Sequence, residues 1–259
     1  METLKQEQEK TSLLCVGLDT ELHKIPDEFR ESGNPIIHFN ETIIRATQEY
    51  CSSYKINFAF YEQYGEKAFS LIKNTIALLP KGKLSIADAK RGDIGNTSGA
   101  YARAVFEDMG FDAITVSPYM GYDSLSPFLE YSDKFVFILA LTSNIGSSDF
   151  QRLICDGKPL YRHVIETALS WQSQAHIGFV VGATHPDELA EIRTYAPDNC
   201  LLIPGVGTQG GNVSQVLQAN GSAPALINVS RDILYGGVNS ETTFSHALNK
   251  AQYYAGLLR

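Results

Sequence analysis

The segment SIADAKRGDIGNTS (85–98) places four charged residues, Asp88, Lys90, Arg91 and Asp93, within six positions. The segment opens within an apolar run that has the composition of a buried strand. Asp88 and Lys90 are two residues apart, so on a strand their side chains share a face, which in a barrel is the interior. Carboxylates close to Lys90 in the sequence favour its charged form, which is a poor Schiff-base nucleophile but a good proton donor. The cluster predicts proton transfer by Lys90, and a buried structural ion network is the alternative.

A glycine-rich segment, IPGVGTQGGN (203–212), follows another apolar run and precedes a helical pattern. Gly205, Gly207 and Gly210 satisfy G-x-G-x-x-G, but a dinucleotide site also requires an acidic residue after the next strand. That strand ends here in NVSRD, where the cation Arg231 comes first. We therefore favour a phosphate site, with backbone N–H groups and Arg231 as donors, over a dinucleotide site or glycines that serve turns alone.

Other polar residues lie at or near the ends of further apolar runs. Asp19 closes the first run, Lys55 lies in the second, Ser143 follows the fifth, and Pro204 to Gln209 ends the seventh. Catalytic groups of β/α barrels occupy the C-terminal ends of the strands. Charges that serve only the surface would be scattered over the helices as well, so the pattern favours one active site.

The elements that would position these residues alternate along the chain. Short apolar, β-branched runs predict eight strands, at 13–19, 54–60, 84–90, 113–118, 135–142, 176–184, 200–207 and 225–231. Amphipathic or capped segments predict helices at 39–51, 65–79, 98–110, 159–171, 185–196, 212–219 and 242–258, with a short helix within 121–130. This order predicts a (β/α)₈ TIM barrel of the α/β class, with residues 1–259 as a single domain, and an open doubly wound sheet is the alternative. Residues 142–159 form the longest irregular stretch and are expected to be an active-site loop or insertion.

Composition narrows the possible partners. The 259 residues are 44% hydrophobic and 19% charged, as in an ordinary soluble globular protein, and the net charge is −8. A nucleic-acid or anionic-membrane partner would require a basic face, which the sequence does not indicate. The four cysteines are far apart and the start, METLKQEQEK, is not a signal peptide, so we expect free thiols and a cytoplasmic protein.

These residues resemble a known family. The segment DAKRGDIGNTS is similar to the D-x-K-x-x-D-I-x-x-T signature of orotidine 5′-phosphate decarboxylases, and the resemblance runs from about residue 13 to 235. It continues in order through GLD, YKIN, LTSN, IPGVGTQGG and VSR. The residues within these motifs resemble those of the longer bacterial branch of the family. Two positions depart from the expected pattern, since Thr20 follows GLD and Ile145 follows SN where proline is expected.

The resemblance implies an activity and a homodimer with shared active sites. The reaction is the conversion of orotidine 5′-monophosphate to uridine 5′-monophosphate and CO₂, the last step of de novo pyrimidine biosynthesis, without metal or cofactor. By match to the motif, Lys90 protonates C6 and Asp88 lies beside the carboxylate that is lost. Asp93 and Thr97 reach the ribose of the neighbouring subunit's site.

The same resemblance implies the substrate contacts of the remaining positions. Asp19 and Lys55 bind ribose hydroxyls and extend the array of alternating charges around Lys90. The other contacts are with the pyrimidine, through Ile94, Pro204 and the amide-reading Ser143, and with the phosphate, through Gln209 and Arg231, with Ser230 beside Arg231 as a further binding position.

Two other functions remain open from the residues. A metal-dependent 3-keto-sugar-phosphate decarboxylase or phosphosugar aldolase shares D-x-K-x-x-D, but it would carry a glutamate ligand on the second strand, where Lys55 lies. A phosphate-ligand binding barrel without catalysis is the third possibility, and the Asp88, Lys90 and Asp93 set argues against it.

Overall fold

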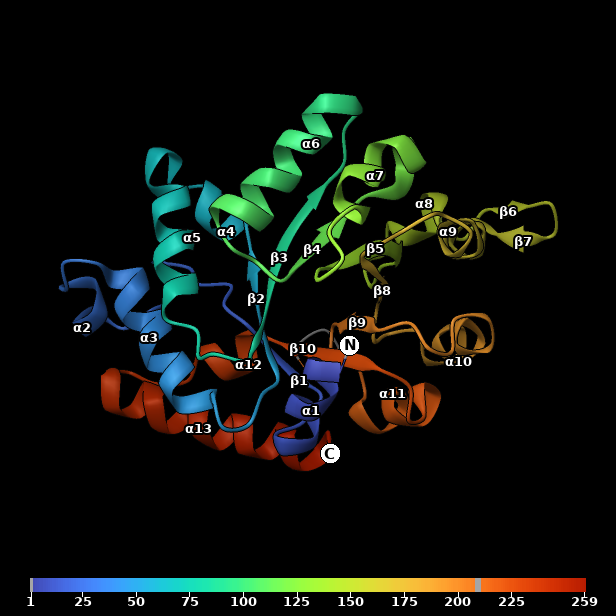
Figure 1. Cartoon of the computed structure of the whole chain (residues 1–259). Coiled ribbons are helices and arrows are strands. Elements are labelled where there is room, and N and C mark those ends of the chain that lie inside the picture. Colours follow the sequence, from blue (N-terminus) through green and yellow to red (C-terminus); the bar gives the residue numbers. More distant parts are fainter. Residues whose placement is uncertain (1, 208–210) are drawn as a thin grey trace. The chain divides into compact units, whose positions relative to one another are not determined.

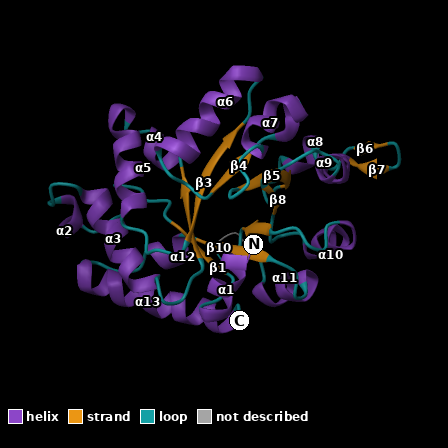
Figure 2. Ribbon diagram, in the orientation of Figure 1, coloured by secondary structure: helices purple, strands orange, loops and turns teal. Residues whose placement is uncertain are grey.

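The computed structural model describes residues 2–207 and 211–259. Eight strands close into a parallel barrel in the order β1-β10-β9-β8-β5-β4-β3-β2 (Figure 2). They are β1 (Leu14–Gly17), β2 (Ser53–Asn57), β3 (Leu84–Arg91), β4 (Ala113–Val116), β5 (Phe135–Leu141), β8 (His176–Val181), β9 (Leu201–Pro204) and β10 (Ala225–Val229). Every predicted strand is present, and the (β/α)₈ expectation is confirmed over the open sheet.

Helices follow the strands along the chain (Figure 1). The longer ones are α1 (Glu2–Lys10), α3 (Pro35–Thr47), α5 (Ala68–Ala77), α6 (Gly95–Arg103), α7 (Tyr122–Leu129), α9 (Leu160–Leu169), α10 (Pro186–Tyr195), α11 (Val213–Asn220) and α13 (Ser240–Leu257). Shorter ones are α2 (Asp27–Arg30), α4 (Ala59–Glu62), α8 (Ser147–Phe150) and α12 (Arg231–Leu234), with single 3₁₀ turns at Gly65–Lys67 and Pro118–Met120.

Three sequence expectations about helices and loops need correction. The helix expected from residue 39 begins at Pro35, because proline suits the first helical turn and Asn34 precedes it. The helix expected at 98–110 begins at Gly95 and passes into a π-helix at Ala104–Asp108. The stretch 142–159 is not irregular throughout, since it holds α8 and a hairpin of β6 (Ile154–Cys155) and β7 (Lys158–Pro159).

By their internal contacts the residues form two compact units. The first comprises Met1–Ala89, Met109–Phe111 and Asn228–Arg259, and the second comprises Lys90–Asp108 and Asp112–Ile227.

The first unit is built on β1, β2 and most of β3. In the parallel register Gly17 lies opposite Lys55, and Asn57 lies opposite Asp88. The apolar face of α3, with Phe39 and Ile43 fully buried, packs in this unit, and α13 lies against α3. The strands that carry Lys55 and Asp88, and the loop after β1 that carries Asp19, are thereby fixed by a packed core.

The second unit is built on β4, β5, β8 and β9. At Gly178 of β8 an added Cβ would lie 2.5 Å from the Cys200 carbonyl oxygen and 2.7 Å from the Phe137 ring, so only glycine fits there. The hairpin β6–β7 projects from this unit beyond α9 (Figure 1). Ion pairs tie this insertion to the neighbouring helices, among them Lys158 with Glu166 at 2.8 Å.

The backbone at Lys90 departs from the expected strand geometry. Its φ is 48°, a left-handed value that is uncommon for a residue with a side chain. Asp88 is buried, as expected for an inward position, whereas Lys90 is exposed. The prediction that Asp88 and Lys90 share a face assumed extended geometry throughout, and the φ of Lys90 interrupts the alternation of an extended strand at this residue.

Candidate active site

Three charged side chains meet in the first unit. Lys55 Nζ donates to Asp88 Oδ2 at 2.9 Å and lies 3.4 Å from Asp19 Oδ1. The Lys55 side chain is 4% exposed, Asp88 10% and Asp19 15%. The three come from adjacent strands, since Asp19 follows β1, Lys55 lies on β2 and Asp88 lies on β3. The strand pairing thus brings together three of the residues that the sequence predicted for the site.

The two carboxylates hold Lys55 in its charged form. Burial alone would lower the pKa of this amine, but the attraction of Asp19 and Asp88 outweighs it and raises the pKa above its ordinary value. Two carboxylates thus flank one ammonium group in this array. Such an array can bind hydroxyl groups through the carboxylate oxygens and the ammonium hydrogens.

The strand that leads to Asp19, β1, is buried along its whole length. Cys15 of β1 is fully buried, and burial raises the pKa of its thiol to about 12, so the thiol is neutral and is not a nucleophile. At Gly17 an added Cβ would lie 2.9 Å from Ser230 Cβ, and Ser230 Oγ donates to the Gly17 carbonyl at 3.1 Å. Ser230 is therefore packed on β1, and the exposed Arg231 follows it at the start of α12.

The second unit carries the rest of the opening cluster. The Lys90 backbone N–H donates to the buried Thr115 Oγ1 at 3.0 Å, which fixes the left-handed turn at this residue. Further along, Ser98 Oγ donates to the Ser124 carbonyl at 2.5 Å. The segment between these two anchors leaves Ile94 57% exposed and Thr97 exposed as well.

Within that segment Asp93 and Arg91 have defined neighbours. Asp93 Oδ1 accepts from the Ile94 N–H at 2.7 Å, which turns the chain into α6. Arg91, to which the sequence assigned no role, lies with its guanidinium 5.3 Å from the centre of the Tyr101 ring. That distance is a cation–π contact.

The loops after β5, β8 and β9 approach one another closely. At Gly182 an added Cβ would lie 2.8 Å from the Ser143 backbone nitrogen, so this glycine lets the two loops meet. Gly205 and Gly207, after Pro204, have φ of 101° and 84°, values that favour glycine. The Gly211 N–H donates to the Gly205 carbonyl at 3.1 Å and closes the loop. Gln209 lies outside the described residues.

Sequence reasoning missed the side chains that hold the loop after β1. Tyr235 donates its hydroxyl to the Asp19 carbonyl at 3.0 Å, although the two residues are 216 positions apart. No local pattern signals such a contact, because it depends on α12 lying beside this loop.

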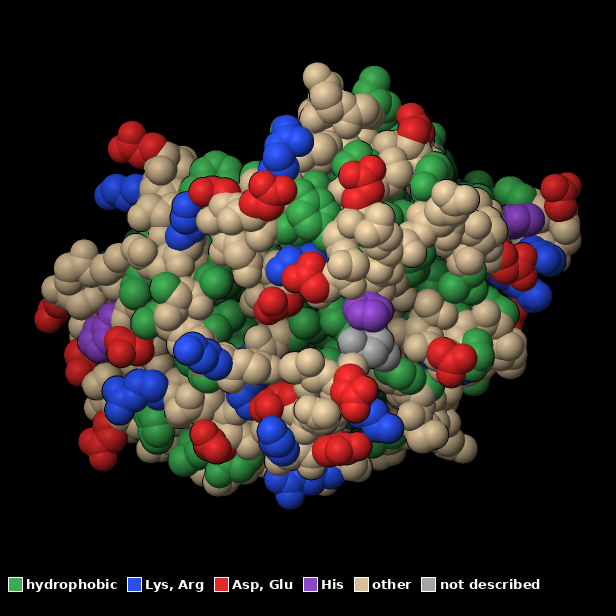
Figure 3. All heavy atoms as spheres, in the orientation of Figure 1, with side chains coloured by type: hydrophobic (Ala, Val, Ile, Leu, Met, Phe, Trp, Pro, Cys, Tyr) green, Lys and Arg blue, Asp and Glu red, His purple; other side chains and the backbone are tan. Residues whose placement is uncertain are grey.

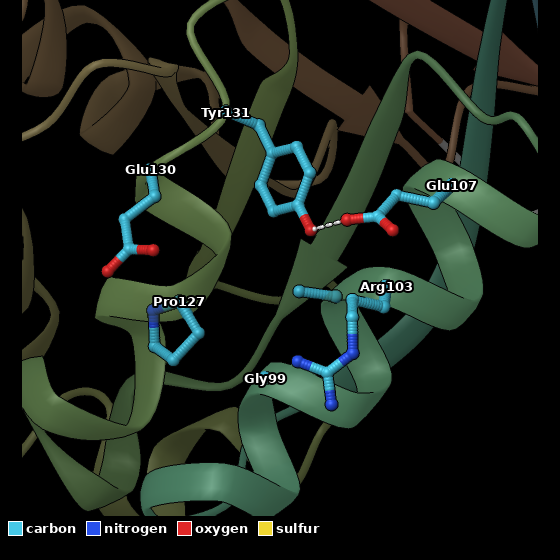
Figure 4. A pocket seen from close by; sticks show the side chains of 7 residues that line it. Gly99, Arg103, Glu107, Pro127, Glu130 and Tyr131 are labelled. Carbon is cyan, nitrogen blue, oxygen red and sulfur yellow. Dashed lines mark hydrogen bonds between the residues drawn. The ribbon is translucent and has the colours of Figure 1, made fainter.

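A separate pocket of about 250 Å³ lies in the second unit between α6, the π-helix and α7 (Figure 4). Tyr131 donates to Glu107 Oε1 at 2.6 Å, and burial together with that carboxylate raises the pKa of Tyr131 to about 12. None of the predicted site residues lines the pocket, whose lining is Gly99, Ala102, Arg103, Glu107, Pro127, Glu130 and Tyr131. We therefore do not assign it to the active site.

Three broader features bear on possible ligands and partners. On the face drawn in Figure 3, acidic and basic side chains are interspersed, and the described residues form no extended basic patch there. Across residues 2–207 and 211–259, no group of three or more His, Cys, Asp or Glu side chains is arranged to hold a metal ion. Within the same residues no helix has the length and apolar character that crossing a membrane requires.

Comparison with known proteins identifies the family. Residues 12–243 match the model of the orotidine 5′-phosphate decarboxylase / HUMPS family. The chain is 50% identical over 244 residues to an orotidine 5′-phosphate decarboxylase of Christiangramia forsetii, a match that covers 92% of this chain and 90% of that protein. The chain belongs to this family.

Solved structures of the decarboxylase family have the same fold. Leishmania donovani OMP decarboxylase superposes with a TM-score of 0.85 at 35% identity, covering 99% of this chain and 97% of the other. Leishmania donovani UMP synthase gives 0.89 at 37% identity, and there the match covers 99% of this chain but 55% of the longer one. The relatives with 43–50% identity carry the decarboxylase name, so the metal-dependent sugar-phosphate alternative is not supported.

Proposed function

We propose that this chain decarboxylates orotidine 5′-monophosphate to uridine 5′-monophosphate and CO₂ without a cofactor, as the last step of de novo pyrimidine biosynthesis. The observation that carries the proposal is the buried Asp19–Lys55–Asp88 array, which occurs in a chain 50% identical to a protein of that name. A site that must hold ribose hydroxyls and oppose a substrate carboxylate needs this combination of charges.

The proposed chemistry assigns the proton to Lys90. Loss of CO₂ from C6 of the pyrimidine leaves a carbanion with no carbonyl or imine to accept the electron pair. A fixed ammonium group can stabilise that negative charge and then donate its proton to C6. Lys90 is exposed, so its ammonium can reach a substrate that enters from solvent, and the Thr115 hydrogen bond fixes the backbone from which it extends.

Asp88 and Lys55 have complementary parts in this proposal. Asp88 would face the substrate carboxylate, and the repulsion between them is relieved when CO₂ leaves. Because Lys55 donates to Asp88 at 2.9 Å, the Asp88 carboxylate, which is only 10% exposed, is held in place. With Asp19, Lys55 would also bind the ribose hydroxyls.

The pyrimidine and phosphate contacts are proposed from residues at the strand ends. Ser143, which packs against Gly182, would read the amide edge of the base, and Pro204 at the end of β9 would line its pocket. The phosphate would be bound by Arg231 and Gln209, with Ser230 supporting Arg231 through its contact with Gly17.

We also propose a homodimer with shared active sites. Ile94 is 57% exposed, Thr97 is exposed and Asp93 is partly exposed, although the two ends of their segment are anchored. An exposed isoleucine between polar residues on an anchored segment is well suited to a subunit contact. In this arrangement Asp93 and Thr97 complete the partner's ribose site and Ile94 the partner's pyrimidine pocket.

Residues 1–259 are proposed to act as one domain in the cytoplasm. Two of the four borders between the compact units fall inside β3 and β10, whereas domain boundaries normally lie in exposed linkers. The four cysteines have free thiols, which suits a reducing compartment.

The test is an absorbance assay of orotidine 5′-monophosphate decarboxylation by the purified chain in the presence of EDTA. We expect full turnover, and complete loss that metal restores would contradict the proposal. Lys90→Ala should abolish CO₂ release while leaving the urea midpoint of unfolding unchanged, because Lys90 is exposed. Near-normal turnover by this variant would remove Lys90 from the proposed role.

A further inference from the structure

The loop after β1, residues 18–22, is held by four side chains of the first unit, which lie on α3, on α4, just after α4 and just after α12. Each residue of the loop takes part in one such contact. The contacts are Tyr61 Oη to the Leu18 carbonyl (2.9 Å), Tyr235 Oη to the Asp19 carbonyl (3.0 Å), Thr20 Oγ1 to Asn40 Oδ1 (2.6 Å), the Glu21 N–H to Tyr235 Oη (2.9 Å) and the Leu22 N–H to Tyr64 Oη (3.2 Å).

We call these five contacts the frame of the loop. Its inner part is a buried network of hydrogen-bonded polar side chains. Thr20, Asn40, Tyr61 and Thr75 are all fully buried. Asn40 accepts from Thr20 and donates through Nδ2 to Tyr61 Oη at 2.9 Å and to Thr75 Oγ1 at 3.0 Å. A satisfied buried network favours a single arrangement, because any other leaves a buried donor or acceptor unpaired.

The outer part of the frame is Tyr235. Its hydroxyl accepts from the Glu21 N–H and donates to the Asp19 carbonyl, so it spans the residues on either side of Thr20. Burial raises the pKa of this phenol above its ordinary value, which keeps the proton that the second bond requires. Its ring stacks on Phe39, with centroids 6.1 Å apart and planes inclined by 19°.

The frame fixes the backbone from which the Asp19 carboxylate extends. Asp19 Oδ1 is 3.4 Å from Lys55 Nζ, a longer contact than the 2.9 Å between Lys55 and Asp88. Held at 3.4 Å and 15% exposed, the Asp19 carboxylate can still accept a hydrogen bond from a ligand hydroxyl.

We propose that Thr20, Asn40 and Tyr235 are positioning residues that set the Asp19 carboxylate for the hydroxyl groups of the substrate sugar. This inference rests on the proposed function. Thr20 stands where the family pattern led us to expect proline. At this position the hydrogen bond to Asn40, rather than a proline ring, restricts the backbone conformation. Loss of these contacts should therefore weaken substrate binding, because Asp19 would no longer be held in position.

The test compares Thr20→Val, which keeps the shape and removes the hydroxyl, with Thr20→Ser, which keeps the hydroxyl. Thr20→Val should raise the KM for orotidine 5′-monophosphate about tenfold, because it leaves Asn40 Oδ1 buried without its donor, whereas Thr20→Ser should stay within about twofold of the parent chain. Thr47→Val is the matched control, since Thr47 is equally buried and hydrogen-bonded, to the Ile43 carbonyl at 2.8 Å. The control should lose stability to a similar degree without a change in KM.

Non-additivity separates positioning from a general loss of stability. In an Asp19→Asn background, Thr20→Val should lower kcat/KM by no more than about twofold further, since its effect passes through the carboxylate already lost. Tyr235→Phe keeps the ring stack and removes both hydroxyl contacts, so it should likewise raise KM in the parent chain and have little further effect in the Asp19→Asn background. It replaces Thr20→Val in this test if Thr20→Val does not fold. The inference would be overturned if the losses of kcat/KM in the double variants equalled the product of the losses in the single variants. It would also be overturned if Thr20→Val changed KM no more than Thr47→Val does. A parent chain that does not turn over the substrate would instead overturn the proposed function.

Discussion

Replacing Lys55 by methionine tests the charge array most directly. Methionine keeps most of the length of the lysine stem but leaves Asp19 and Asp88 facing each other with no cation between them. Each of the two contacts, at 2.9 and 3.4 Å, is worth about 5 kcal/mol at an effective dielectric constant of about 20. Against this stands a desolvation cost of several kcal/mol for the buried ammonium. We therefore expect Lys55→Met to lower the free energy of unfolding by about 3–5 kcal/mol at pH 7.

The destabilisation should depend on pH in a defined direction. In the variant the two carboxylates repel each other, so one of them binds a proton more tightly in the folded than in the unfolded chain. Its stability should then rise as the pH falls, and the difference from the parent should shrink by up to about 1.4 kcal/mol per pH unit below neutrality. In the parent, the raised pKa of Lys55 contributes stability that is fully present below the unfolded pKa of about 10.4 and is lost as the pH rises through the folded value.

Urea unfolding of both proteins at pH 7 and pH 5 measures these effects, and the decarboxylation assay measures activity. Lys83→Met is the matched control, because the Lys83 side chain is only 8% exposed and pairs with Glu7 Oε1 at 2.5 Å and the Cys51 carbonyl at 2.8 Å, but is not among the predicted site residues. The control should lose stability and keep its KM. A Lys55→Met chain that loses less than about 1 kcal/mol, or whose loss is the same at both pH values, would refute the electrostatic argument.

Three further predictions follow from other parts of the structure. Arg231→Ala should raise the KM about 10- to 100-fold, the worth of hydrogen bonds to a charged group, and leave the urea midpoint unchanged because the side chain is exposed; a collapsed midpoint would indicate a structural role instead. Mixing inactive Lys90→Ala and Asp93→Asn chains should restore about a quarter of the sites, since half of the dimers are hybrids with one intact site, and hybrids that form without activity would contradict a shared site. Gly178→Ala should destabilise the chain by about 1–3 kcal/mol, because its Cβ would meet the Phe137 ring at 2.7 Å, and an unchanged midpoint would contradict that packing.

Local pattern was sufficient for the strands and insufficient for the helix starts. All eight apolar runs contain a barrel strand. A strand that is buried on both faces is apolar at consecutive positions, so a short window of sequence is enough to recognise it. The start of α3 at Pro35 was missed by four residues, since the first turn contributes little to the amphipathic pattern. The hairpin in 142–159 was missed as well, because each of its strands has only two residues and the β6 residues are exposed.

The predicted site residues differ in the same way. Asp88 was placed correctly as buried from its position in the strand pattern, whereas the left-handed backbone of Lys90 was not foreseen. That conformation is held by Thr115, which is 25 positions away, so no window around Lys90 contains the cause.

By itself the sequence determined the barrel, the strand ends that carry the polar residues, and the family to which the chain belongs. These depend on the order of residues along the chain, through periodicity, turn chemistry and motif spacing. Only the tertiary structure decided that Lys55 lies between Asp19 and Asp88, and that Asn40, Tyr61 and Tyr235 hold the loop of Asp19. Those contacts join residues 20 to 216 positions apart, and their geometry is set by packed strands and helices rather than by neighbours in the chain.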